Sequence, residues 1–276
     1  MNSRLLYNLY GKTFFADVYV FYPNGELKKL SPSDSGIYYQ PHINPQGNKV
    51  VFYGSENGPP RVWIAKIKTG RAAALTPETS GARHPVFSWD GSMIAFASDR
   101  SYHQNPERIE LMRGNGLPPE ELVLHLFIMD TNGKNVRQIT FGPYQDQRPA
   151  FSPDGKTLAF VSNRGSARGL WTVQIDGNHE PRPLQMDGWG YRPWYSPDGQ
   201  WIYFFTSIKN RHQICKISIN GGQIFSLPND DSGTSHGPFV DYDNATMLLH
   251  SNRNGKFGIW ELPLDGTEPR QVMLPD

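Results

Sequence analysis

The stretch FSPDGKTLAFVSNR at residues 151–164 places an Asp-Gly pair between two short apolar runs. Asp-Gly in this setting is a strong signal for a β-hairpin, because a type I′ turn needs a positive φ at both central residues. Close copies stand at 87–100 (FSWDGSMIAFASDR) and 195–207 (YSPDGQWIYFFTS). The motif therefore predicts a hairpin that the chain repeats, and gives Ser-Pro-Asp-Gly the role of a turn.

The repeat has a period near 44 residues. Its first-hairpin turns are spaced 44, 64, 44 and 45 residues apart, at Gly47, Gly91, Gly155, Gly199 and Asn244. A second turn follows in each copy, and these second turns contain Gly25, Gly70, Gly133, Gly177, Gly221 and Gly266. Two hairpins make four strands per repeat, and six second turns predict six repeats. The one long step reflects an insertion at 101–124.

The second strand of each repeat is apolar on both faces, as at 50–52 (VVF) and 158–160 (LAF). In a sheet with one solvent-exposed face, polar and apolar residues would alternate along each strand. These sheets must therefore be covered on both sides. Four-stranded units of this length that stack on one another form a β-propeller. We therefore predict an all-β fold in one domain, a six-bladed β-propeller of four-stranded antiparallel blades. The blades are expected at 1–36, 37–80, 81–144, 145–188, 189–232 and 233–276.

The first blade is predicted to be incomplete. Counting one period back from Gly47 puts its first turn near residue 3, which leaves strands only at 4–11, 16–22 and 26–31. An unpaired strand edge is a template for another strand. We therefore expect self-association through this edge, or a strand from a partner.

Composition limits the classes of partner and the compartment. The net charge is +1, with 27 basic and 26 acidic residues, which argues against nucleic acid as the main partner. No apolar stretch approaches the roughly 18–20 residues of a membrane span. Cys215 is the only cysteine, so the chain can form no intrachain disulfide. The start of the chain does not read as a signal peptide. If Met1 is the native start, a cytoplasmic location is favoured. If a signal peptide was removed, a periplasmic location is favoured.

The candidate site lies where the innermost strand of each blade begins, at the expected mouth of the channel. A polar residue stands just before the proline of this strand, or one place earlier in the last blade. With His42, one step further along, the predicted ligand-binding residues are Gln40, His42, His84, Arg148, Arg192 and His236. Arginine presents a planar fork that suits carboxylate or phosphate. Histidine can bind metal, so His84 and His236 are also candidate ligands of a divalent metal. The insertion at 101–124 is expected to emerge on the same face.

The full pattern, P-x-[FWY]-S-P-D-G-x-x-[IL]-A-F-x-S-[ND]-R, resembles the TolB-type propeller repeat, which is a WD-like repeat. It is complete at 149–164, and at 85–100 only Trp89 departs from it by replacing the second proline. TolB itself has an additional α/β domain before its propeller, and we expect none to be encoded here.

The resemblance implies a binding module that takes a protein segment, or a small anionic or carbohydrate ligand, at the channel face. Some propellers of this type, the oligogalacturonate lyases, use a histidine-held divalent metal. The alternative is therefore a metal-dependent enzyme similar to these lyases, or another carbohydrate-active enzyme. Under that alternative His84 and His236 would hold the metal, and Arg148 or Arg192 would bind the carboxylate or remove a proton. The sequence leaves open whether the protein is an enzyme.

Overall fold

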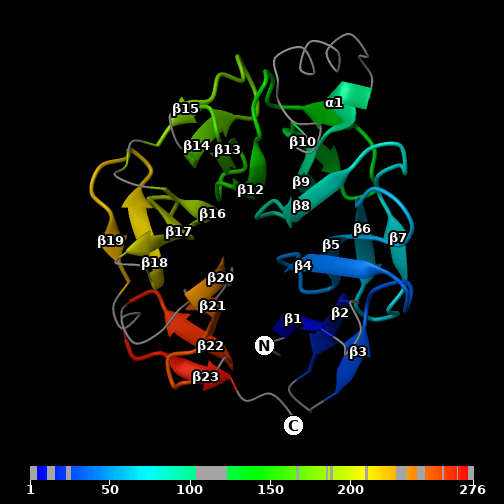
Figure 1. Cartoon of the computed structure of the whole chain (residues 1–276), viewed down its shortest axis with the longest axis horizontal. Coiled ribbons are helices and arrows are strands. Elements are labelled where there is room, and N and C mark those ends of the chain that lie inside the picture. The colour runs from blue at the N-terminus through cyan, green and yellow to red at the C-terminus, as the bar shows by residue number, and fades with distance from the viewer. Residues whose placement is uncertain are drawn as a thin grey trace. The chain divides into compact units, whose positions relative to one another are not determined.

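The computed structural model describes residues 5–10, 16–22, 26–103, 123–165, 168–184, 186, 189–208, 211–227, 235–240, 246–256, 258–265 and 267–272. The chain divides into two compact units, Met1–Gln147 and Arg148–Asp276. Figure 1 labels the strands of both units except β11. Most of the insertion predicted at 101–124 lies outside the described residues.

The first unit holds three antiparallel sheets. The N-terminal sheet has the order β1-β2-β3, with bounds Leu5–Tyr10, Ala16–Phe21 and Leu27–Lys29. The second has the order β4-β5-β6-β7, with bounds Ile37–Ile43, Lys49–Ser55, Arg61–Lys66 and Ala72–Ala74. The third has the order β11-β10-β9-β8, and from β8 to β11 its bounds are Ala82–Phe87, Met93–Ser98, His125–Asp130 and Arg137–Gln138. A four-residue helix, α1 (Arg100–His103), follows β9.

The second unit also holds three sheets. The first has the order β12-β13-β14-β15, with bounds Gln147–Phe151, Thr157–Ser162, Gly169–Gln174 and Arg182–Pro183. The next has the order β16-β17-β18-β19, with bounds Tyr191–Tyr195, Trp201–Ile208, Arg211–Ser218 and Phe225–Ser226. The last has the order β20-β21-β22-β23, with bounds Ser235–Val240, Thr246–Ser251, Gly258–Pro263 and Arg270–Val272.

The number of blades differs from the prediction. Within the described residues five sheets have four strands, which gives five four-stranded blades where the sequence predicted six blades with an incomplete first one. The N-terminal sheet has three described strands, and they fall within the intervals 4–11, 16–22 and 26–31 that the sequence indicated. The residues that would pair with the free side of β1 as an innermost strand would precede Leu5, outside the described residues.

The opening motif forms a turn. Gly155 has a φ of 70°, and the equivalent Gly47, Gly91 and Gly199 have φ values of 64°, 74° and 69°. The Ser152 hydroxyl donates to Asp154 Oδ1 (2.6 Å), and the same carboxylate oxygen accepts from the Lys156 N–H (3.0 Å). These hydrogen bonds, led by the one from Ser152, lower the pKa of Asp154. Ser-Pro-Asp-Gly therefore stabilises the chain reversal through its side chains as well as through its glycine.

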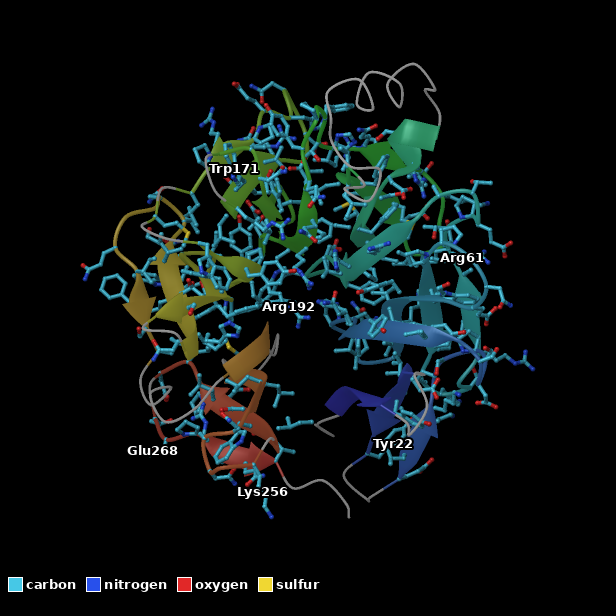
Figure 2. The ribbon with its side chains drawn as sticks, viewed as in Figure 1. Tyr22, Arg61, Trp171, Arg192, Lys256 and Glu268 are labelled. Carbon is cyan, nitrogen blue, oxygen red and sulfur yellow. The ribbon has the colours of Figure 1, made fainter. Side chains whose placement is uncertain are left out.

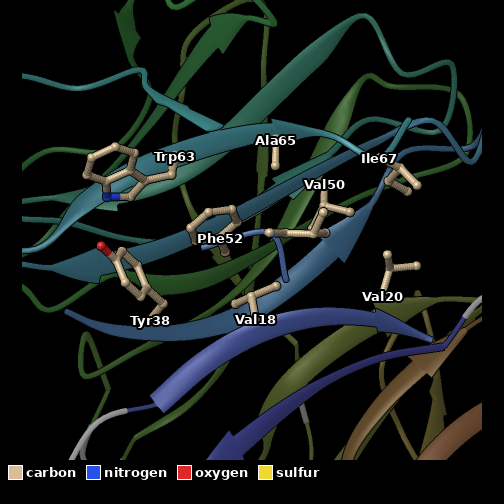
Figure 3. Packing of buried hydrophobic residues seen from close by; sticks show 9 residues of the cluster. Val18, Val20, Tyr38, Val50, Phe52, Trp63, Ala65 and Ile67 are labelled. Atoms are coloured by element: carbon tan, nitrogen blue, oxygen red, sulfur yellow. The ribbon is translucent and has the colours of Figure 1, made fainter. Parts of the chain in front are cut away.

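Neighbouring sheets within a unit pack face to face. On β5, Val50 and Phe52 are fully buried and pack with Val18 and Val20 of β2, as Figure 3 shows. Val51, between them, points to the other face and packs in a cluster with residues of the third sheet, among them Phe96. The second strand is thus buried on both faces, as its sequence predicts. Burial of each such side chain contributes about 1.5–3 kcal/mol to stability.

Helices make up little of the described structure. None of those described has the length and apolar character to span a membrane.

Candidate functional site

The innermost strand of most sheets carries a β-bulge at an X-Pro pair. Register shifts occur between Tyr39 and His42 in β4, Arg83 and Val86 in β8, Tyr191 and Trp194 in β16, and His236 and Phe239 in β20. Proline lacks the N–H that a ladder requires, so a strand accommodates it at a bulge. A bulge re-aims the side chains beside it.

The residue before the proline adopts an uncommon backbone conformation. Positive φ values occur at Gln40 (49°), His84 (56°), Arg148 (56°) and Arg192 (52°). This conformation costs roughly 1–2 kcal/mol for a residue with a Cβ, and such residues concentrate at functional sites. Four of the six predicted ligand-binding residues therefore share one strained conformation. The sequence did not predict it.

In the second unit, Arg148 and Arg192 stand at this position on the neighbouring innermost strands β12 and β16. Arg148 Cζ lies 4.3 Å from the centroid of the Tyr191 ring, so its guanidinium stacks on the residue next to Arg192. Tyr191 is itself held edge-on by Phe205, at 5.2 Å between ring centroids. Both arginines are half-buried, and Figure 2 labels Arg192. Cation–π stacking of this kind fixes the plane of a guanidinium.

In the first unit, His84 and Gln40 hold the equivalent position on β8 and β4. His84 is 8% exposed, and its ring meets the Tyr53 ring edge-on at 5.3 Å between centroids. Tyr53 in turn contacts Tyr39, with ring centroids 5.7 Å apart. Gln40 is half-buried. A neutral amide and an imidazole thus take the places that arginines hold in the second unit.

His42, a predicted ligand-binding residue, is buried and accepts a hydrogen bond from a neighbouring sheet. Its ring is 3% exposed, and Nδ1 accepts a hydrogen bond from the Phe87 N–H (3.2 Å). Burial lowers the pKa of His42 to about 3, against a small opposing effect of the Ile43 backbone. The ring is therefore neutral, with its proton on Nε2, and it joins β4 to β8.

A divalent metal at His84 and His236 stays a prediction. His84 belongs to the first unit and His236 to the second, and the side chain of His236 lies outside the described residues. Within the described parts of the chain, no three His, Cys, Asp or Glu side chains come together in a group that could hold a metal ion.

One histidine outside the predicted set makes hydrogen bonds through both of its ring nitrogens. His125, on β10, is fully buried, and its Nε2 lies 2.7 Å from the Gly142 carbonyl. Since a carbonyl only accepts, Nε2 carries the proton and Nδ1 accepts from the Ser101 hydroxyl at 2.7 Å. His125 therefore positions the start of α1, and no motif in the sequence marks it for that role.

Comparison with known proteins places these features in a family. A family model described as the TolB β-propeller domain matches residues 120–274. The Tol-Pal system protein TolB of Francisella tularensis is 23% identical, and the match covers 86% of this chain and 51% of that protein. The chain spans between about a quarter and a half of the length of the curated relatives that it matches.

Two solved structures show the same fold. TolB from Acinetobacter baumannii has a TM-score of 0.63 at 20% identity, and the match covers 97% of this chain and 65% of that one. An oligogalacturonate lyase in complex with manganese has a TM-score of 0.60 at 16% identity, with 90% of this chain and 71% of that one covered. At these identities the likeness concerns the fold alone.

Proposed function

Because this chain belongs to the TolB β-propeller domain family, we propose that it is a binding module for an acidic ligand. Its fold is all-β, with four-stranded antiparallel blades. The ligand is a small molecule with a carboxylate or phosphate group, such as an acidic sugar. Arg148 and Arg192 of the second unit bind its anionic group. The resemblance to TolB-type propellers supports a binding role, and the side chains at the bulges support the acidic class.

A single observation carries this proposal, the pair of arginines that precede the proline of the innermost strands β12 and β16. Each is held at a positive φ, and Arg148 is stacked on Tyr191. A guanidinium in a fixed plane loses little freedom when it binds a carboxylate bidentately. The aromatic ring beside the two cations supports a ligand with an apolar face, as a sugar ring has.

In the first unit, taken by itself, Gln40 and His84 hold the corresponding positions. They adopt the same conformation on β4 and β8, and they offer an amide and an imidazole in place of the guanidinium groups. Amide and imidazole groups donate to and accept from hydroxyls. We propose that they contact uncharged polar groups of a ligand that binds within the first unit.

The proposal is tested by ligand-induced thermal shifts with galacturonate, glucose 6-phosphate and, as the neutral control, glucose. At a hundredfold excess over Kd, an acidic ligand should stabilise the wild type by about 2.7 kcal/mol. Arg148→Gln and Arg192→Gln should each weaken binding about tenfold or more, since a hydrogen bond to a charged group contributes roughly 1.5–3 kcal/mol.

The matched control is Arg182→Gln, which removes an exposed arginine from the outer strand β15 of the same unit. It should leave the shifts unchanged. Equal shifts in the wild type and in the Arg148→Gln, Arg192→Gln double variant would contradict the proposal. Binding of acidic peptides but not of the sugars would move the ligand class to a protein segment.

A metal-dependent lyase acting on an acidic sugar is the second candidate. It is favoured by one observation, the presence of His84 at a strained bulge position of a fold shared with an oligogalacturonate lyase. The described residues do not by themselves supply a set of metal ligands. Formation of an unsaturated uronate from polygalacturonate with Mn²⁺, and its loss with EDTA, would support the lyase. Uronate binding without that product supports the binding module.

A further inference from the structure

Arg100 is a half-buried cation that begins α1, two residues after the end of β9 in the third sheet of the first unit. Figure 1 labels both elements. Its backbone is fixed, because its N–H donates to Ser98 Oγ (3.2 Å) and that hydroxyl donates to the Gly81 carbonyl (2.7 Å). The neighbouring carboxylate of Asp99 is 3% exposed and accepts from the Gly81 N–H (2.7 Å). The start of the Arg100 side chain is therefore set by the end of the strand.

The guanidinium of Arg100 packs on two aromatic rings. Its Cζ lies 5.1 Å from the ring centroids of both Phe96 and Phe127, which stack on each other 5.7 Å apart. Both rings are buried, at 0% and 4% exposure. Burial lowers the pKa of Arg100, partly offset by the charge of Asp99. An ionic hydrogen bond formed in such surroundings is stronger than one at the surface.

One edge of this guanidinium is buried without a hydrogen-bond partner. Within the part of the chain that the structure describes, neither Nε nor Nη2 of Arg100 has a partner, and both atoms are buried. The N–H groups of these two nitrogens point the same way, and their spacing fits the two oxygens of a carboxylate. Native proteins rarely leave charged donors buried and unsatisfied.

The equivalent arginine of the last sheet differs in this respect. Arg253 follows β21 as Arg100 follows β9, and its Cζ lies 5.0 Å from the centroid of the Trp260 ring. Its Nε, however, donates to Ser251 Oγ (3.5 Å). The hydroxyl of Ser98, in the place of Ser251, is already used by the Gly81 carbonyl and the Arg100 N–H. Among the described arginines, Arg100 is the one for which both Nε and Nη2 are buried without a hydrogen-bond partner. Aromatic stacking alone does not produce this, because Arg253 is stacked as well.

We propose that Arg100 is an anion-binding site, in which the Nε–Nη2 edge takes a carboxylate group of a molecule from outside this chain. Phosphate offers the same pair of oxygens and is the second source of this chemistry. The Phe96 and Phe127 rings supply an apolar wall, which favours a carboxylate attached to an apolar group. The site shares no residue with the arginine pair of the second unit, so the two proposals fail or stand separately.

The test compares Arg100→Met with the wild type in chloride, acetate and phosphate at equal ionic strength and pH. In chloride, Arg100→Met should unfold at the same temperature as the wild type or higher, because methionine fills the space without a charge to desolvate. With the arginine pair of the second unit removed in both proteins (Arg148→Gln, Arg192→Gln), acetate or phosphate should raise the Tm where Arg100 is present and leave the Tm of Arg100→Met unchanged. A response to acetate alone identifies a carboxylate site, and a response to phosphate alone a phosphate site.

Two further measurements keep the proposal falsifiable if Arg100→Met folds poorly. Arg100→Lys keeps the charge but not the planar fork, and it should bind acetate at least tenfold more weakly than the wild type. In the wild type, the ¹⁵N–¹H resonance of Arg100 Nε should shift on titration with acetate. Arg253→Met is the matched control, and it should lower the Tm while keeping the response to acetate.

Two results would overturn the proposal. A clear loss of stability of Arg100→Met in chloride would show that the guanidinium already has a partner within the chain. Equal responses to acetate and phosphate in the wild type, Arg100→Met and Arg100→Lys would place any anion binding elsewhere.

Discussion

At the scale of single residues, the bulge explains why neighbouring polar positions of β4 have different roles. In a regular strand Gln40 and His42 would share one face, since side chains alternate. The register shift between Tyr39 and His42 inserts an extra residue and exchanges the faces. Gln40 is therefore half-buried and His42 almost fully buried. The sequence could predict polar residues beside the proline, but the exchange of faces depends on a bulge that residue spacing alone does not reveal.

The strain at these positions can be measured at Arg192. Arg192→Gly and Arg192→Ala both remove the guanidinium, but only glycine adopts a positive φ without steric cost. We expect Arg192→Gly to be more stable than Arg192→Ala by about 0.5–1 kcal/mol, which is the strain less the larger chain entropy of glycine. Urea unfolding measures the difference. The reverse order of stability would mean that the position is relaxed in solution.

At the scale of elements, His42 couples two strands through a neutral imidazole. The ring on β4 accepts from the backbone of Phe87 on β8, so its protonation would break a hydrogen bond between two sheets. The pKa of His42 is about 3 in the folded state, against an ordinary value of 6.5. Between these values the unfolded chain binds a proton that the folded chain does not.

Stability should therefore fall as the pH drops below 6.5, the ordinary value of the His42 pKa. The contribution of His42 to the slope is at most about 1.4 kcal/mol per pH unit, because one proton is involved. The stabilisation that the neutral His42 ring provides is complete above the unfolded pKa of 6.5 and is lost progressively towards pH 3. His42→Gln should lack this part of the slope, as measured by urea unfolding at pH 7.5, 6 and 5. The control is His179→Asn, at a half-buried position whose positive φ asparagine tolerates. The same pH dependence in His42→Gln and the wild type would rule out His42 as the source.

At the scale of the whole molecule, the spacing of glycines decided more of the fold than any other feature. Turns at Gly47, Gly91, Gly155 and Gly199 have the positive φ that Asp-Gly and related pairs favour. The same spacing left the N-terminal sheet one strand short, and three described strands are present there. Site chemistry could be predicted only in outline, because Arg148 meets Tyr191 across two sheets. Such a contact depends on tertiary packing that no local pattern encodes.

The N-terminal sheet gives a prediction about assembly. β1 pairs with β2, and its other edge has no partner strand among the described residues. An unpaired strand edge is a template for another strand. We expect concentration-dependent self-association, measured by sedimentation velocity. Successive N–H groups of a strand point to opposite sides. Of Tyr7→Pro and Asn8→Pro, one should therefore disturb the β1–β2 ladder and lower the Tm. The other should leave the Tm nearly unchanged and abolish self-association. Association that persists in both variants would exclude this edge as the contact.

The shared conformation before the proline has a consequence for protein engineering. Glutamine, histidine and arginine occupy the same backbone conformation at residues 40, 84, 148 and 192. A proline follows each of these residues and the conformation is the same with three different side chains, so one codon per sheet can be randomised without redesigning a strand. A library built on these codons would sample new recognition chemistries on an unchanged frame. The repeats themselves already carry three different amino acids at these four positions.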